Sequence, residues 1–180
     1  RMVSLYNFGD IDRREVPVHE GEVVGVIGCG NVGMDAARTA LRMGAKEVYV
    51  IYHKTENEMS ALRSEYEDAV AEGVKFLWRT ATQEFICDNN SGWITGLKVD
   101  TPEGEKVLSF NRILLANGSL PANRIVSTTT GIDVDSSGYV ITKDRPYGMT
   151  TRKGVFAGGD VVHTPQTVVL AMKEAKKVAV

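Results

Sequence analysis

A glycine-rich hexapeptide is the part of the sequence whose residue types and spacing point most directly to chemistry. A complete G-x-G-x-x-G pattern follows the apolar run 22–27 and consists of Gly28, Cys29, Gly30, Asn31, Val32 and Gly33. In this pattern the first glycine allows a tight turn, the second lets the backbone approach a pyrophosphate, and the third allows close helix–strand packing. The N–H groups and the positive dipole end of the next helix then stabilise the phosphates. The motif therefore predicts a dinucleotide site, with all six residues as candidates for binding the cofactor.

The residues that end the second apolar run indicate which dinucleotide binds. Units that bind NAD place an Asp or Glu about 20 residues after the glycines to bind the ribose hydroxyls, and SAM-binding units do the same. This chain instead has Tyr52, His53 and Lys54, followed by Glu56 as the first carboxylate. Lys54 and a partly charged His53 would attract the 2′-phosphate of NADP, and Arg63 is a candidate second contact. The sequence favours NADP and leaves NAD possible, with a solvated Lys54 as the alternative interpretation.

Alternating apolar runs and helical patterns around the motif predict an α/β fold with a parallel sheet. Continuous apolar runs predict buried strands over 22–27, 47–52 and from residue 74 onward. Helical patterns lie between them over 31–43 and 60–73. The first strand–helix–strand passage is complete and matches a Rossmann-like unit.

The second predicted helix carries its own start and stop signals. Ser60 can cap its N-terminus and Gly73 ends it. Its predicted apolar stripe consists of Leu62, Tyr66, Ala69 and Val70.

The pattern changes period after this unit. Three alternating stretches over 82–88, 92–100 and 105–110, joined by turn signals, predict an antiparallel meander inserted into the α/β fold. A parallel-type strand is expected again over 112–116. The remaining chain predicts a hairpin around residues 136–138, a strand over 154–159 and a helix from about Gln166.

The expected organisation has three parts. Residues 1–21 are a lead-in with one short strand near 2–6, residues 22–118 are a nucleotide-binding domain, and residues 119–180 are the returning portion of a second domain.

Composition argues against several classes of partner. The 180 residues carry 21 basic and 23 acidic side chains, and this balance gives no basic footprint for nucleic acid or for an anionic membrane. No apolar run approaches the ~20 residues of a membrane span, and the N-terminus lacks the apolar core of a signal peptide, so we expect a cytoplasmic protein. Cys29, Cys87 and three scattered histidines form no metal-ligand pattern, so we expect no metal site.

Three phrases occur in an order that resembles a known family. They are VIGCGNVGMDAARTALRMGAKEVYVIYHK, NEMSALRSEYEDAVAEGV and GVFAGGDVVHTPQTVVLAMKEAKKVA. Together with strand ends at Ala116-Asn117-Gly118 and Gly158-Gly159-Asp160, they resemble the glutamate synthase small-subunit (beta-chain) family of FAD-dependent NAD(P)H oxidoreductases. The resemblance covers about residues 22–180. It implies that residues 1–21 lead in from a flavin domain and that residues 119–180 are the returning portion of an incomplete FAD-binding domain.

The resemblance implies roles for these residues. The glycine motif and residues 116–118 would hold the pyridine nucleotide. Gly159 and Asp160 would contact the ribityl or pyrophosphate region of FAD, and the helix starting near Gln166 and Thr167 would direct its N–H groups at the flavin. Asp35 has two interpretations, an acid near the contact of nicotinamide and flavin or a first-turn helix acid.

The chain departs from the family pattern at two motifs and lacks two others. The family usually has two arginines where His53 and Lys54 stand, and a proline at Ser60. This chain contains neither a second G-x-G-x-x-G for the adenine half of FAD nor cysteine clusters for iron–sulfur centres.

The implied activity is hydride transfer from NADPH to FAD, with electrons passing to a larger catalytic or iron–sulfur partner subunit and no side chain acting as a catalyst. We expect this chain to be the NADP-binding fragment, inactive by itself and without retained FAD.

Two alternatives stay open, a Rossmann nucleotide-binding module without catalysis and a SAM-dependent transferase. A short-chain reductase is disfavoured because no Tyr-x-x-x-Lys pair lies on a predicted helix; Tyr139 and Lys143 have that spacing but follow the predicted hairpin turn. Disulfide reduction is disfavoured because no Cys-x-x-Cys precedes the glycine motif.

Overall fold

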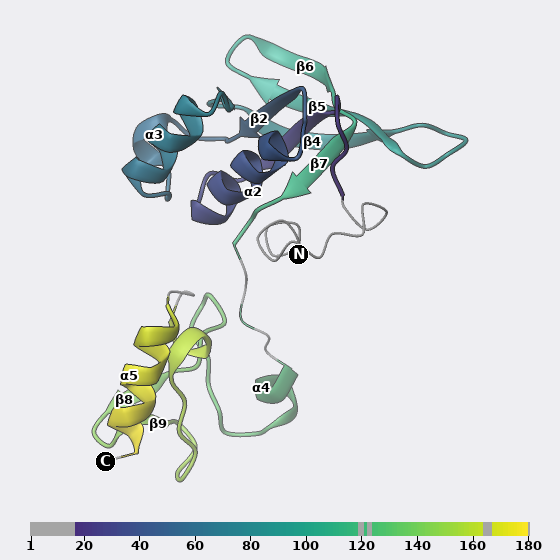
Figure 1. Ribbon diagram of the computed structural model, residues 1–180. Coiled ribbons are helices and arrows are strands. Elements are labelled where there is room, and N and C mark those ends of the chain that lie inside the picture. Colours follow the sequence, from purple (N-terminus) through teal and green to yellow (C-terminus); the bar gives the residue numbers. More distant parts are fainter. Residues whose placement is uncertain (1–16, 119–120, 122–123, 164–166, 180) are drawn as a thin grey trace. The chain divides into compact units, whose positions relative to one another are not determined.

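The computed structural model describes residues 17–118, 121, 124–163 and 167–179 (Figure 1). The chain divides into two compact units, Arg1–Gly118 and Ser119–Val180. No helix among the described residues is both long and apolar enough to cross a membrane. The short strand predicted near residues 2–6 lies outside the described residues.

The first unit is built on a four-stranded parallel sheet. Its strands are β1 (Val23–Ile27), β2 (Glu47–Ile51), β3 (Lys75–Leu77) and β7 (Arg112–Leu115), in the order β3-β2-β1-β7. Valine and isoleucine dominate β1 and β2 because both faces of these strands are covered. The predicted parallel α/β sheet is confirmed.

Two helices cover one face of this sheet. They are α2 (Asn31–Arg42) and α3 (Arg63–Ala71), which Figure 1 shows side by side. On this face Val24, Val26 and Val50 pack against the buried Met34 of α2, and none of the four side chains is exposed. Small residues of α2 face the sheet and let the helix approach closely.

The opposite face packs against the predicted antiparallel meander, which is confirmed. Its strands are β4 (Ala81–Cys87), β5 (Ile94–Thr101) and β6 (Gly104–Ser109), in the order β4-β5-β6. Leu97 and Val99 of β5 form a second buried cluster with Ile27 and Ile51 of the parallel sheet. The unit therefore has three layers, with one core on each side of the parallel sheet.

The region before α3 differs from the sequence prediction. Helix α3 begins at Arg63 rather than Ser60, and its N-cap residue Leu62 makes no side-chain cap. A short 3-10 helix, η2 (Glu56–Glu58), precedes it, and Thr55 forms a capping box there with Glu58. The prediction of Ser60 as the cap of α3 was therefore wrong. The capping box of this region lies earlier, at Thr55, and it caps η2 instead.

The predicted apolar stripe of α3 is only half right. Ala69 is buried and Tyr66 packs against the core, but Leu62 and Val70 are 60% and 46% exposed. The side of α3 that meets α2 carries carboxylates, which pair with Arg38. Charge pairing thus takes the place of part of the apolar contact that the stripe predicted.

The second unit is small. It contains α4 (Arg124–Thr128), an antiparallel hairpin of β8 (Thr142–Asp144) and β9 (Tyr147–Thr150), the 3-10 helix η3 (Gly159–Val161) and α5 (Val168–Val178). The turn expected at residues 136–138 is confirmed by a bridge between Val134 and Val140. The β8–β9 hairpin was not predicted.

The strand predicted over 154–159 is wrong. Only Phe156 forms a bridge, to Met149, and η3 begins at Gly159. Gly154 and Gly159 have φ values of +82° and +73°, which break an extended chain at both ends of the segment. The final helix begins two residues later than expected, because Thr167 is its N-cap, and Gln166 lies outside the described residues.

Candidate functional site: a crevice at the carboxyl ends of the parallel strands

A small crevice opens where the parallel strands of the first unit end. It has a volume of about 90 Å³, and its lining consists of Ile27, Gly28, Ile51, Tyr52, His53, Thr80, Thr82 and Asn117. Strand β1 has β2 on one side and β7 on the other, so the strand order reverses here. In open α/β sheets, ligands bind at such a switch point.

The glycine turn forms one wall of the crevice and is closely packed. Gly28 has a φ of +115°, and a Cβ there would lie 2.6 Å from the carbonyl oxygen of Ala116. A Cβ on Gly33 would overlap the carbonyl oxygen of Gly28. Gly30 is less confined, because its Cβ would meet only the Ser60 hydroxyl, at 3.2 Å. Two of the three glycines are therefore required by the protein's own packing.

The N-terminus of α2 offers donors for an anion. Gly30 is its N-cap residue, without a side-chain cap, and the first turn contains no acidic residue. The first intrahelical hydrogen bond runs from the Met34 N–H to the Gly30 carbonyl, so the N–H groups of the first turn have no carbonyl partner within the helix. Val32 lies in this turn with 68% of its surface exposed. The N–H groups of residues 31–33 have no partner among the residues that the structure describes, and at a positive dipole end such groups suit a phosphate.

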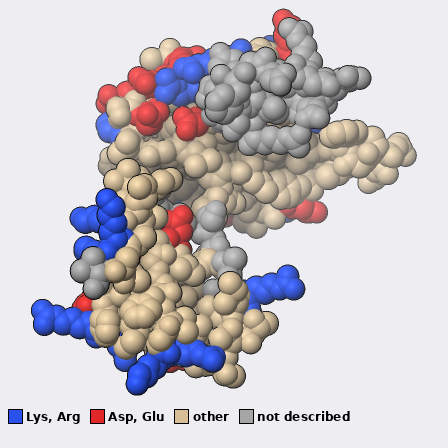
Figure 2. All heavy atoms as spheres, turned by 60° about the horizontal axis from the view of Figure 1, so that its bottom comes forward, with Lys and Arg blue, Asp and Glu red and all other residues tan. Residues whose placement is uncertain are grey.

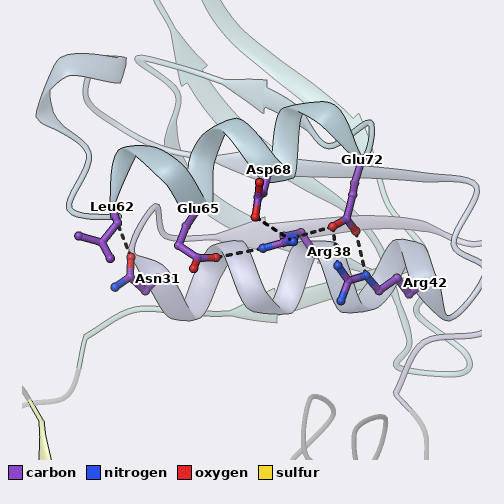
Figure 3. Close-up of polar contacts among 7 residues, drawn as sticks. All are labelled: Asn31, Arg38, Arg42, Leu62, Glu65, Asp68 and Glu72. Carbon is purple, nitrogen blue, oxygen red and sulfur yellow. Dashed lines mark hydrogen bonds and ion pairs between the residues drawn. The ribbon is translucent and has the colours of Figure 1, made fainter.

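Asn31 and Cys29 hold the turn in place. The Asn31 Oδ1 accepts a hydrogen bond from the Leu62 N–H at 2.8 Å, which Figure 3 shows at the start of α3. The Cys29 carbonyl accepts from the N–H groups of Ser60 and Ala61, both at 3.2 Å. Cys29 itself is buried, and burial together with the nearby Glu56 raises the pKa of its thiol to about 11. These two side chains serve the scaffold of the site.

The end of β2 presents one half-buried and two exposed side chains. The Tyr52 hydroxyl donates to the Glu58 carbonyl at 3.1 Å, and its ring lies 4.9 Å from that of His53. His53 and Lys54 are exposed. Among these three, Tyr52 and His53 line the crevice, and Lys54 is the next residue along the chain.

Arg63, the candidate second contact to a 2′-phosphate, is paired with carboxylates in the structure. Its guanidinium pairs with Glu56 at 2.5 Å and with Glu67 at 3.1 Å. The hydrogen bonds from Arg63 and Tyr66 hold the pKa of Glu56 below its usual range. Arg63 therefore neutralises carboxylates beside the turn.

An ion-pair network fixes α3 to α2 and was missed by the sequence reasoning. Arg38 contacts Glu65 at 3.0 Å, Asp68 at 3.2 Å and Glu72 at 2.8 Å, and Arg42 also binds Glu72 (Figure 3). The hydrogen bond to Glu72 raises the pKa of Arg38, and the bond from Arg42 is the main cause of the lowered pKa of Glu72. The network positions the segment that closes over the glycine turn.

The end of β3 was also missed. Thr80 is buried and donates its hydroxyl to the Trp78 carbonyl at 3.0 Å, while Thr82 lies on β4. Both line the crevice. The rule that parallel strands end at one edge, applied to all three predicted strands, would have pointed to residues 78–80.

The end of β7 reaches the same crevice. The Ala116 N–H donates to the Ile27 carbonyl at 2.8 Å, and Asn117 lines the cavity. Gly118 is exposed, with open space around it. The structure thus brings Gly28, His53 and Asn117 together from three strand ends. Asp35 is exposed on α2 and is not part of the crevice lining.

The residues expected to contact a flavin lie together in the second unit. A cavity of about 240 Å³ is lined by Gly159, Asp160, His163, Thr167, Leu170, Ala171 and Glu174. Thr167 caps α5 by accepting from the Leu170 N–H at 3.3 Å. Glu174, which the sequence reasoning missed, accepts from the Gly159 N–H and lies 2.8 Å from the His163 Nε2.

The parallel sheet, the glycine turn and the uncapped helix define a Rossmann-type nucleotide-binding unit. Residues 5–175 match the family described as pyridine nucleotide-disulphide oxidoreductase. The chain therefore belongs to that family.

Individual relatives agree with this family. The chain is 34% identical to the NADP(+)-dependent formate dehydrogenase subunit beta of Moorella thermoacetica over 95% of its own length and 26% of that protein. It is 29% identical to the glutamate synthase [NADPH] small chain of Escherichia coli, covering 98% of this chain and 41% of the relative. The resemblance drawn from the sequence phrases is confirmed.

A solved structure shares the fold. Thioredoxin reductase of T. acidophilum superposes with a TM-score of 0.77 at 22% identity, over 89% of this chain and 51% of that one. The chain thus spans between about a quarter and a half of the length of these three proteins.

Proposed function

We propose that the first unit binds NADPH and that the protein works in a flavin-dependent NADPH oxidoreductase. The observation that carries the proposal is the uncapped N-terminus of α2, which follows the turn at Gly28. Gly28 and His53 line the same crevice, and Lys54 is the residue after His53. Phosphate groups suit the first site, and the cations suit a 2′-phosphate. The family and the NADPH-linked names of the relatives support the same function.

The residues present fit a dinucleotide. The backbone of residues 30–33 would hold the pyrophosphate, because no acidic side chain stands in that turn. His53 and Lys54 would face the adenosine ribose, and Asn117 would border the nucleotide near β7. In the second unit, Gly159, Asp160 and Thr167 would contact the flavin.

The chemistry belongs to the cofactors. When bound, NADPH would supply a hydride and FAD would accept it, so the protein's part would be to orient the two rings and keep water away. We propose that the electrons leave through a partner subunit, since the relatives are named as small chains or beta subunits.

One titration series tests the proposal. The purified chain is titrated with NADPH, NADH, SAM and FAD by calorimetry, and NADPH is expected to bind tighter than NADH, with no binding of SAM. Equal affinity for NADH, or binding of SAM, would contradict it. A yellow protein as purified would contradict the expectation that this chain retains no FAD.

A glycine variant tests the site itself. Gly33→Ala places a Cβ against the Gly28 carbonyl, so NADPH affinity should fall by more than tenfold, about 1.4 kcal/mol or more. The matched control is Gly73→Ala, where a Cβ meets open space at the end of α3. Its φ of +97° costs roughly 1–2 kcal/mol of stability, but NADPH affinity should be unchanged.

A further inference from the structure

We propose that Arg79, at the end of β3, is a specificity residue that binds the 2′-phosphate of NADP together with Lys54. This inference rests on the proposed binding of NADPH and extends it to a residue outside the glycine motif and the β2 end. It assigns a ligand to a side chain that no sequence motif singled out.

Arg79 lies directly beside the expected phosphate position. Its backbone N–H donates to the carbonyl of Lys54 at 2.9 Å, and the next residue, Thr80, donates to the carbonyl of Tyr52 at the same distance. The pairing of β2 with β3 therefore continues past both strands and sets Arg79 next to Lys54. Thr80 and His53 line the crevice itself, and Arg79 and Lys54 are their neighbours along the chain.

The carboxylates near the crevice are bound by other groups, which leaves Lys54 and Arg79 available to bind an anion. Arg63, the other basic residue nearby, is engaged by Glu56 and Glu67. In the described part of the chain, neither Lys54 nor Arg79 takes part in an ion pair. Lys54 attracts the Glu58 carboxylate electrostatically. That carboxylate already accepts hydrogen bonds from the backbone N–H and the hydroxyl of Thr55, at 3.2 and 2.8 Å.

The backbone of Arg79 is itself unusual. Its φ is +51°, and among the described residues it is the one non-glycine in the left-handed region. That conformation is uncommon for a long side chain and favours glycine or asparagine. Unfavourable backbone conformations of this kind are concentrated at functional sites. Arginine there suits a phosphate, because its planar group binds two phosphate oxygens at once.

The test separates the 2′-phosphate from the rest of the nucleotide. The chain is titrated by calorimetry with 2′,5′-ADP and with 5′-AMP, which differs from it only in lacking the 2′-phosphate. Wild type should prefer 2′,5′-ADP. Arg79→Asn keeps a residue that tolerates the backbone conformation and should reduce that preference about tenfold, while Arg79→Lys should keep most of it. The control Lys46→Gln removes an exposed cation before β2, at the opposite edge of the sheet, and should change nothing.

The outcomes distinguish this inference from the proposed function. Retention of the wild-type preference by a folded Arg79→Asn, checked by circular dichroism, overturns the role of Arg79 and leaves NADPH binding intact. If Arg79→Asn does not fold, Arg79→Lys together with a salt titration decides, because a wild-type preference for 2′,5′-ADP that does not fall with salt overturns the inference. A wild type that binds neither nucleotide overturns the proposed function as well.

Discussion

The two units of the chain differ most in how they bury apolar surface. The first unit has a core on each face of its parallel sheet, and side chains such as Met34, Val50 and Leu97 are fully buried. Among the described residues of the second unit, only Val140, Gly148 and Thr150 are buried. Its helix α5 leaves Val168 and Met172 77% and 58% exposed. The first unit is therefore stabilised by its own packing, whereas the second gains little from burial.

Charge separates the units as well. The first contains 13 basic and 18 acidic residues, and the second 8 basic and 5 acidic. Figure 2 shows acidic and basic side chains mixed on the visible face of the first unit. Within the first unit, many of the carboxylates form ion pairs with Arg38 and Arg63, and these pairs connect different elements.

The largest expected effect tests burial with one residue type in each unit. Met34→Ala removes a fully buried side chain and should lower the free energy of unfolding by about 2–5 kcal/mol. Met172→Ala, in the exposed position, should change it by less than about 0.5 kcal/mol. Urea denaturation followed by the fluorescence of Trp78 and Trp93, both in the first unit, measures the first effect, and far-UV circular dichroism covers both. Equal losses would show that α5 is buried in solution and would break the comparison.

The sequence predicted the first unit well because its signals are local. Apart from a leading glutamate, the runs over 22–27 and 47–52 are apolar or aromatic, and a side chain has no room at positions 28 and 33. Turn signals over 89–92 and 102–104 likewise marked the two connections within the meander. Periodicity could not reveal that α3 packs through carboxylates, because Arg38 and Glu72 are 34 residues apart and only the fold brings them together.

The second unit was predicted less well, for a physical reason. A strand over 154–159 follows from apolar residues, but pattern analysis assumes a core that those residues can enter. With few buried neighbours, the positive φ values of Gly154 and Gly159 decide the local path instead. At the crevice, the contributions of Thr80 and Arg79 depend on the register of β2 with β3, which the sequence does not state.

An intermediate effect tests the ion-pair network. Arg38→Gln should lower the free energy of unfolding by about 1–2 kcal/mol at pH 7, because three carboxylates lose a partner that is only 17% exposed. Arg152→Gln is the control in the second unit, since the one hydrogen bond of its guanidinium to a described residue goes to the Thr130 carbonyl.

The pH dependence of this difference has a defined sign. Folding lowers the pKa of Glu72, so its contribution is complete above the ordinary carboxyl pKa of about 4.3 and is lost as the pH falls through the lower folded value. The difference between wild type and Arg38→Gln should therefore shrink between about pH 5 and pH 3. A difference that stays constant over this range would contradict the role of charge.

Lowered carboxyl pKa values also occur elsewhere in the first unit, so acid should destabilise that unit. These carboxylates are Glu47, Glu56, Glu58, Asp88 and Glu103.

The smallest perturbation needs no change to either core, because the two cysteines already report on the first unit. Cys87 is exposed, while Cys29 is buried with a thiol pKa of about 11. A thiol reagent at pH 8 should therefore modify one cysteine quickly, and the second only when the first unit opens. Met34→Ala should speed the slow reaction by about tenfold for each 1.4 kcal/mol lost, provided that opening precedes modification. Met172→Ala should leave the rate of the slow reaction unchanged. Cys29 becomes exposed only when α2 separates from the parallel sheet, and α5 belongs to the other unit. Acceleration by Met172→Ala would mean that the two units unfold together, so that the difference in burial does not make them independent in stability.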